Sequence, residues 1–365
     1  MSAAVERAEP NDDDEDGAGA VDAAPEWHGA WFGGGGDAAR VWYAAATASH
    51  GAPLLDAATG RDDTGVLAWA ATDVMGEALA SPGGRRLVRG ARVVELGAGC
   101  GLCGLLTAAL GAAAVTLTDV NAAALRFAAM GAERAARESG GACDVSVAAL
   151  DWLSFRGGAP ASPRFAADVV IASDVVYPDS STDALDGLCA AVAAVLRCGD
   201  RCGDRMSIAR VAELGSPATG PLGVDLAAVA DLARTRPIAL VAFVDRDGFV
   251  SAKRLASHAS RRGLLVRRVD ASSFTNRRPK LDGALLWIDR AADATPQALY
   301  EAARAALPGI ARAELLERLE AEPCTCSERG CGGDDGCSCA RCRGLRAGCR
   351  WELEDQAFAF GGAVV

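Results

Sequence analysis

The chain has 365 residues, of which 50% are hydrophobic, and its mean hydropathy is +0.13. Global disorder is therefore excluded, and there is enough chain for two domains or for one domain with appendages. The 37 basic and 48 acidic residues give a net charge of −11, which argues against a general nucleic-acid-binding surface. With no apolar run of about 18 residues and no signal or transit peptide, we expect a soluble cytoplasmic protein, with the nucleus as an alternative location, and no membrane partner.

Residues 1–40 are predicted to form a flexible leader. They are acidic, rich in Ala and Gly, and end near the glycine run Gly33–Gly36. Only Trp27, Trp31 and Phe32 could anchor this segment to a folded domain.

Residues 41–290 alternate short β-branched runs with Ala- and Leu-rich helical stretches. This rhythm predicts an α/β fold with a doubly wound, mostly parallel, seven-stranded sheet of the Rossmann-like kind. The predicted strands are Val93–Leu96, Val115–Asp119, Val145–Leu150, Asp168–Ser173, Ile238–Val244, Leu264–Val269 and Ala284–Ile288, and the predicted helices are Gly101–Leu110, Ala122–Glu138, Ser181–Leu196 and Phe249–Arg261.

Three segments lie outside this rhythm. Residues 197–236 contain a tandem Arg-Cys-Gly-Asp and are interpreted as an insertion, and residues 291–322 as a helical extension. Residues 323–365 form a Cys-rich tail. Short spacing between thiols is typical of zinc sites, so zinc is a candidate ligand, and a reduced tail without metal is the alternative. The candidate ligands are Cys324, Cys326, Cys331, Cys337, Cys339, Cys342 and Cys349.

A glycine-rich loop, with Gly97, Ala98 and Gly99 at its centre, directly follows the first predicted strand. Glycines let the chain turn tightly and let its backbone approach a ligand closely. Asp119 ends the next predicted strand, where a carboxylate can hold a ribose diol. The pattern predicts an adenosine-type cofactor at the carboxyl ends of the strands, and the alternative is a glycine turn that serves packing only.

Glu95, two residues before the first glycine, indicates which cofactor this is. A carboxylate would repel the pyrophosphate of a dinucleotide, whereas it would attract a ligand that carries an ammonium and a sulfonium. S-adenosylmethionine has both cations and no phosphate. Methyl transfer is therefore favoured over the hydride transfer of a nicotinamide-dependent oxidoreductase.

Further candidate site residues follow the third and fourth predicted strands. Asp151 could accept a hydrogen bond from the adenine amino group, and Trp152 could stack on the ring. Ser173, Asp174 and Tyr177 would emerge into the same crevice. Packing of Trp152 in the core, a hydrogen bond from Tyr177 to a nearby carbonyl, and capping of the next turn by Asp174 are the alternatives.

These residues resemble the seven-β-strand (class I) S-adenosylmethionine-dependent protein-lysine methyltransferases, of the methyltransferase family 16 type. The resemblance covers about residues 60–290, and its most specific element is Asp174-Val-Val-Tyr177. Ala172-Ser-Asp174 departs mildly from the Gly-Ala-Asp that relatives often have. The matching pieces are Gly65-x-x-x-Trp69, Glu95-Leu-Gly-Ala-Gly-x-Gly101, Asp119, Asp151-Trp152 and Asp174-x-x-Tyr177.

The resemblance implies methyl transfer to a lysine side chain of a protein substrate. Asp174 and Tyr177 would line the acceptor channel, where Asp174 anchors the incoming ammonium and Tyr177 helps to align it. A methyltransferase for a small molecule or another residue is one alternative, and an inactive cofactor-binding scaffold with a zinc-binding, partner-recruiting tail is another. The residues that the resemblance places against S-adenosylmethionine are Trp69, Gly97, Ala98, Gly99, Asp119, Trp152 and Ser173.

Overall fold

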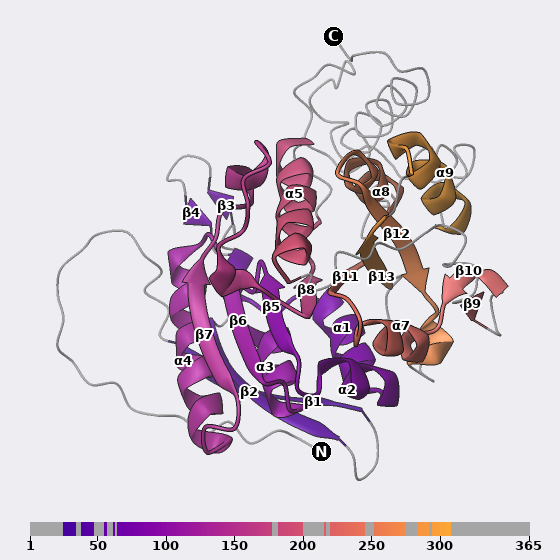
Figure 1. Cartoon of the computed structure of the whole chain (residues 1–365). Coiled ribbons are helices and arrows are strands. Elements are labelled where there is room, and N and C mark those ends of the chain that lie inside the picture. Colours follow the sequence, from indigo (N-terminus) through magenta and orange to yellow (C-terminus); the bar gives the residue numbers. More distant parts are fainter. Residues whose placement is uncertain are drawn as a thin grey trace, which may run out of the picture.

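The fold is known from a computed structural model, which describes most of the chain between residues 25 and 307 (Figure 1). The described segments are 25–33, 38–46, 55–56, 61–62, 64–176, 182–199, 215–216, 220–244, 252–274, 283–291 and 294–307. The expectations for the Cys-rich tail, for Tyr177 and for most of the leader lie outside these residues.

All seven predicted strands form, and they lie in one sheet. In spatial order they are β7 (Asp144–Ala149), β6 (Ala114–Asp119), β5 (Arg92–Leu96), β8 (Val169–Ser173), β11 (Ile238–Val244), β13 (Gly283–Arg290) and β12 (Leu264–Val269). The pairs are parallel from β7 to β11, whereas β13 is antiparallel to both of its neighbours. Every residue of β11 is buried, as expected for a strand that is covered on both faces.

The sheet has nine strands, which corrects the prediction of seven. Residues assigned to an insertion supply β9 (Gly215–Ser216), β10 (Gly220–Val224) and the helix α7 (Leu226–Leu232). β10 pairs in parallel with β12 and antiparallel with β9, which is the edge strand. The sequence of β10, Gly-Pro-Leu-Gly-Val, does not look like a strand. Its register with β9 is irregular between Gly220 and Val224, and such an irregularity is a place where proline is tolerated.

Helices cover both faces of the sheet and give three layers (Figure 1). One hydrophobic core joins the sheet to α1 (Ala71–Ala80), α2 (Pro82–Val88), α3 (Leu102–Ala109), α4 (Ala122–Glu138) and α7. A second core joins the opposite face to α5 (Thr182–Gly199) and α8 (Ala252–Arg261). The extension predicted to be helical contains α9 (Pro296–Ala306), which packs against α8 and β12.

Part of the predicted leader is ordered into a hairpin, which corrects its assignment as flexible. Strand β1 (Glu26–Phe32) pairs antiparallel with β2 (Ala39–Ala45), and β2 lies against α3 and α4. Phe32 is buried, and its ring lies where a Cβ on Gly76 of α1 would be. Trp31, by contrast, is 52% exposed. The sequence of β1 shows no clean alternation of apolar and polar residues, and its order comes from pairing and from the Phe32 contact.

A second small hairpin, β3 (Leu55–Asp56) with β4 (Arg61–Asp62), precedes the sheet. Among the described helices, none combines the length and apolar character that crossing a membrane would require.

Candidate active site

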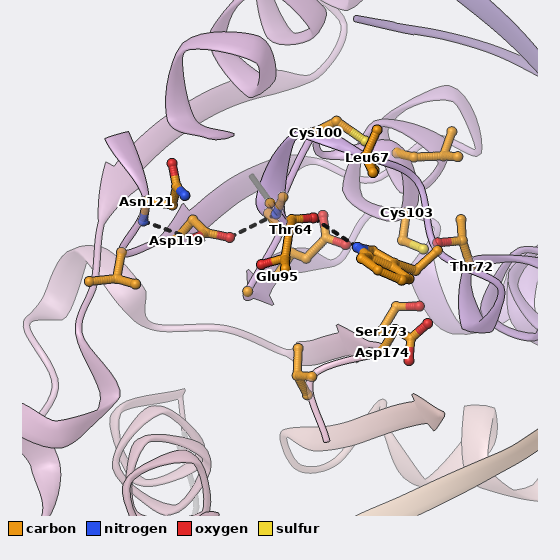
Figure 2. Close-up of a pocket in the computed structure, with 18 of the residues that line it drawn as sticks. Thr64, Leu67, Thr72, Glu95, Cys100, Cys103, Asp119, Asn121, Ser173 and Asp174 are labelled. Atoms are coloured by element: carbon orange, nitrogen blue, oxygen red, sulfur yellow. Dashed lines mark hydrogen bonds between the residues drawn. The ribbon is translucent and has the colours of Figure 1, made fainter. Parts of the chain in front are cut away.

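One pocket, with a volume of about 270 Å³, lies at the carboxyl ends of β5, β6, β7 and β8 (Figure 2). This volume is near the lower end of the roughly 300–1,000 Å³ of small-molecule sites. Tyr177 lies outside the described residues, so its place relative to the pocket stays a prediction. The other ten residues predicted for the cofactor and acceptor all line the pocket: Trp69, Glu95, Gly97, Ala98, Gly99, Asp119, Asp151, Trp152, Ser173 and Asp174.

The glycine loop turns through left-handed backbone conformations. Gly97, Gly99 and Gly101 have φ angles of 65°, 54° and 79°, which side chains with a Cβ rarely adopt. A Cβ on Gly99 would also lie only 2.9 Å from the carbonyl oxygen of Gly65. The glycines therefore let the loop pack directly against the short 3-10 helix Thr64–Val66, which forms another wall of the pocket.

Asp119 joins the glycine loop to the turn after β6. One carboxylate oxygen accepts a hydrogen bond from Gly99 N at 2.8 Å, and the other accepts from Asn121 N at 2.9 Å (Figure 2). A carboxylate oxygen has lone pairs for more than one donor, so Asp119 can hold the loop and still accept from a ligand hydroxyl.

Glu95 is a buried carboxyl group between the two ends of the pocket. Its side chain is 2% exposed and accepts a hydrogen bond from Gly104 N at 2.8 Å. Burial, aided by the charge of Asp119 and opposed by the Gly104 hydrogen bond, raises the pKa of Glu95 to about 8. The group is therefore mostly protonated at pH 7, and a cationic ligand would favour its ionised form.

Asp151 and Trp152 lie at the rim of the pocket. Asp151 caps the 3-10 helix Trp152–Phe155, because its carboxylate accepts a hydrogen bond from Leu153 N at 2.9 Å. Trp152 is half-buried and packs against the second core while it also lines the pocket. Core packing and ligand contact are therefore compatible for this indole.

Asp174 is held in an unusual conformation. It has a φ of 57°, and it is the one residue other than glycine, within the described segments, with a positive φ. Its side chain is 2% exposed, and its carboxylate lies 3.4 Å from Ala71 N at the start of α1. Asp174 thus contacts the N-terminus of a helix 103 residues earlier in the chain. Strained backbone of this kind is concentrated at functional sites.

Trp69 is oriented by a hydrogen bond from its Nε1 to the carbonyl oxygen of Thr64, at 2.8 Å. In Figure 2, Asp119 and Asn121 lie at one end of the pocket, Ser173 and Asp174 at the other, and Glu95 between them.

The sequence interpretation missed several lining residues. Val120 and Leu153 are apolar yet 71% and 49% exposed, so they offer apolar surface at the rim. Val120 directly follows Asp119, and Leu153 lies two residues after Asp151. This closeness to a predicted acid is the signal that could have identified them. Asn121, which caps α4, Thr72, Cys100 and Cys103 also line the pocket.

The two lining thiols are poor candidates for a nucleophile. Burial raises the pKa of Cys100 to about 12, and burial together with the charge of Glu95 raises that of Cys103 well above its usual value. Both stay neutral at physiological pH, whereas the thiolate is the reactive form. They are small buried side chains, as are Cys143 and Cys189.

The charge of the lining has one sign. Four carboxyl side chains line the pocket, Glu95, Asp119, Asp151 and Asp174, and among its described residues there is no Lys, Arg or His. Such a lining suits a cationic ligand and offers no counter-charge for a phosphate. This acidic lining therefore fits S-adenosylmethionine better than a dinucleotide.

Within the described part of the chain, no group of three or more His, Cys, Asp or Glu side chains is arranged to hold a metal ion. The Cys-rich tail lies outside that part, and zinc binding by the tail stays a prediction.

Three solved structures align with this chain at TM-scores below 0.4. The T. Thermophilus 16S rRNA methyltransferase RsmC, in complex with AdoMet and guanosine, aligns with 14% identity and a TM-score of 0.39, covering 72% of this chain and half (50%) of its own. The glycopeptide N-methyltransferase MtfA, complexed with sinefungin, aligns with 12% identity and a TM-score of 0.38, covering 61% and 94%. The ribosomal protein L11 methylase of Lactobacillus delbrueckii subsp. bulgaricus aligns with 13% identity and a TM-score of 0.34, covering 67% and 92%.

No curated protein sequence matches this chain. A family model described as lysine methyltransferase matches residues 34–198, which include β5 to β8 and every described residue of the predicted site. The fold is α/β with a mostly parallel central sheet, which is the architecture expected from the sequence. Residues 34–198, just under half of the chain, are therefore similar to the lysine methyltransferases that this family model describes.

Proposed function

We propose that this protein transfers a methyl group from S-adenosylmethionine to a lysine side chain of a protein substrate. The observation that carries the proposal is the pocket lined by four carboxyl groups, with no cationic side chain among its described residues. Both reactants are cationic when they arrive: the cofactor carries an ammonium and a sulfonium, and lysine carries an ammonium.

The residues divide into two groups at the two ends of the pocket. At one end, Asp119 would accept hydrogen bonds from ribose hydroxyls. Val120, next to Asp119 in the chain, and Trp152 also line the pocket and would contact the adenine ring. Glu95, in the middle, would face the charged part of the cofactor. These assignments place the reacting methyl group toward Ser173 and Asp174.

When bound, S-adenosylmethionine supplies a methyl group on a positively charged sulfur, and this group reacts with an uncharged amine. The protein contributes mainly by alignment, which can supply a large part of a rate acceleration. Asp174 would anchor the incoming lysine ammonium, which must lose its proton to water before transfer. The fixed backbone at Asp174 and its contact with α1 hold the carboxylate in place.

The first experiment is calorimetric titration of the purified chain with S-adenosylhomocysteine, with NADH as the control ligand. We expect saturable binding of S-adenosylhomocysteine and none of NADH. Binding of NADH alone, or of neither ligand, would contradict the cofactor assignment.

The acceptor is tested separately. The chain is incubated with cell lysate and S-adenosylmethionine labelled on its methyl group, and labelled peptides are located by mass spectrometry. Label on lysine in a protein supports the proposal. Label that appears only in small molecules or on other side chains would contradict the lysine assignment and leave the cofactor assignment intact.

A further inference from the structure

A second pocket lies at the opposite ends of the central strands from the candidate active site. Its volume is about 600 Å³, and it is formed by the end of α2, the turn that follows it, and the end of α7. It also reaches Ala91 and Asp168, which immediately precede the strands β5 and β8. The pocket is therefore at the amino ends of strands whose carboxyl ends form the candidate active site, and α2 and α7 lie side by side in Figure 1.

The lining of this second pocket is basic. Of its ten described residues four are arginines, Arg85, Arg86, Arg89 and Arg234, and the one acid among them is Asp168. That acid is already engaged, because Arg92, outside the lining, binds it through the backbone N at 2.9 Å and through Nη2 at 3.0 Å. The chain as a whole carries a charge of −11, so this concentration of positive charge is a local feature.

Two of the arginines have a structural role that accounts for them. Arg85 Nε donates to the carbonyl oxygen of Ala80 at 2.9 Å, and Arg86 Nη2 donates to that of Ala227 at 3.1 Å. Arg86 also approaches Asp231 at 3.8 Å, a pair whose side chains are 46% and 62% exposed. Such exposed pairs contribute little to stability, and basic residues are common near helix C-termini because they offset the helix dipole.

The other two arginines are not accounted for in this way. Arg89 and Arg234 are exposed, and neither makes a side-chain hydrogen bond or ion pair with any residue that the structure describes. Gly90, next to Arg89 in the chain, lines the pocket with open space on the side where a Cβ would project. Two uncommitted guanidinium groups therefore face an open concavity whose only acid is already paired.

We propose that this pocket binds a small ligand that bears phosphate groups, held by Arg89 and Arg234 with Arg85 and Arg86 beside them. Guanidinium groups form charge-assisted, often bidentate hydrogen bonds with phosphate oxygens. The volume lies within the roughly 300–1,000 Å³ of small-molecule sites, enough for a diphosphate or a nucleotide. This site is separate from the proposed cofactor pocket and goes beyond the methyl-transfer reaction.

The test is calorimetric titration of the full chain with inorganic pyrophosphate at low ionic strength. Pyrophosphate carries two adjacent phosphates and no adenosine, so it cannot enter the other pocket through an adenosine contact. We expect saturable binding with one site per chain. In the double variant Arg89→Gln with Arg234→Gln, we expect affinity to fall by about tenfold or more, since two charge-assisted contacts are removed.

Matched controls separate a site from general charge. Arg126→Gln with Arg137→Gln removes two exposed arginines from α4, and this pair should bind pyrophosphate as the unmodified chain does. S-adenosylhomocysteine binding and the melting temperature should be unchanged in both double variants. The pyrophosphate titration does not depend on binding of S-adenosylhomocysteine, so failure of the cofactor assignment would not affect this test.

Three results would overturn the proposal. They are no pyrophosphate binding, equal binding by the Arg89/Arg234 variant and the unmodified chain, and equal loss in the α4 control. A fourth is binding that appears only after the acids of the run Asp12–Asp16 are replaced by amides, which would assign the pocket to the acidic segment of the chain itself.

Discussion

The two ends of the parallel strands, called here the carboxyl edge and the amino edge of the sheet, carry opposite charges. At the carboxyl edge, four carboxyl groups line a pocket, and two of them, Glu95 and Asp174, are only 2% exposed. At the amino edge, four arginines line a more open pocket, and Arg89 and Arg234 are exposed. Burial makes the carboxyl edge sensitive to protonation and to single substitutions, whereas exposure makes the amino edge sensitive to salt.

The largest expected effect of a single substitution is at Asp119. Replacing it with Ala removes the acceptor for Gly99 N and Asn121 N together with the proposed ribose contact. Hydrogen bonds to charged groups contribute about 1.5–3 kcal/mol each, so we expect S-adenosylhomocysteine affinity to fall by about 100-fold or more in calorimetry. The control is Asp144→Ala, at the exposed start of β7, which should leave the affinity unchanged. An Asp119 variant with unchanged affinity would contradict the proposed contact of Asp119 with the ligand.

Asp174 tests the acceptor end of the same edge. Asn also tolerates a positive φ and can accept from Ala71 N, so Asp174→Asn should fold normally. Loss of the charge should lower kcat by about 100-fold, the scale seen when one positioned polar group is removed, with S-adenosylhomocysteine binding unchanged. Turnover equal to that of the unmodified chain would show that catalysis does not need the charge of Asp174.

Glu95 makes the stability of the cofactor-free protein depend on pH. Its pKa is about 8 in the folded chain and near 4.5 as a free side chain, so between these values the folded state holds a proton that the unfolded state has lost. The free energy of unfolding contributed by this group therefore decreases as pH rises, by at most about 1.4 kcal/mol per pH unit.

Denaturant unfolding from pH 5 to pH 8 measures this slope. Glu95→Gln keeps an acceptor for Gly104 N but does not titrate, so its unfolding free energy relative to the unmodified chain should rise with pH. A constant difference across the pH range would show that Glu95 ionises normally in its buried position.

The smallest effect compares the two edges directly. Raising the salt concentration from about 20 to about 300 mM should weaken pyrophosphate binding severalfold, because exposed charges are screened. The affinity for S-adenosylhomocysteine should change by less than about twofold. Glu95 is buried, and salt screens buried charges less than exposed ones. An equal salt dependence of the two ligands in parallel titrations would contradict the contrast between the edges.

The sequence alone was sufficient for the central strands and for most of the candidate site. Buried parallel strands are short runs of β-branched residues, and each site acid stands at the end of such a run, so strand ends and site residues are found together. The glycine loop could be interpreted because its residues are consecutive and need left-handed backbone angles.

The tertiary structure decided what depends on contacts between distant segments. β10 is a strand because it pairs with β12. β1 is ordered because it pairs with β2 and because its Phe32 packs against α1. Its own composition would favour a loop at β10, since glycine and proline disfavour strands.

The same reason separates the two pockets. The acids of the cofactor pocket stand within or shortly after the carboxyl ends of successive strands, a pattern that the sequence displays locally. The contact of Asp174 with Ala71 joins residues 103 positions apart, and the basic pocket joins α2, Asp168 and α7 across about 150 residues (85 to 234). No local pattern encodes either arrangement, because helix packing against the sheet alone brings these segments together.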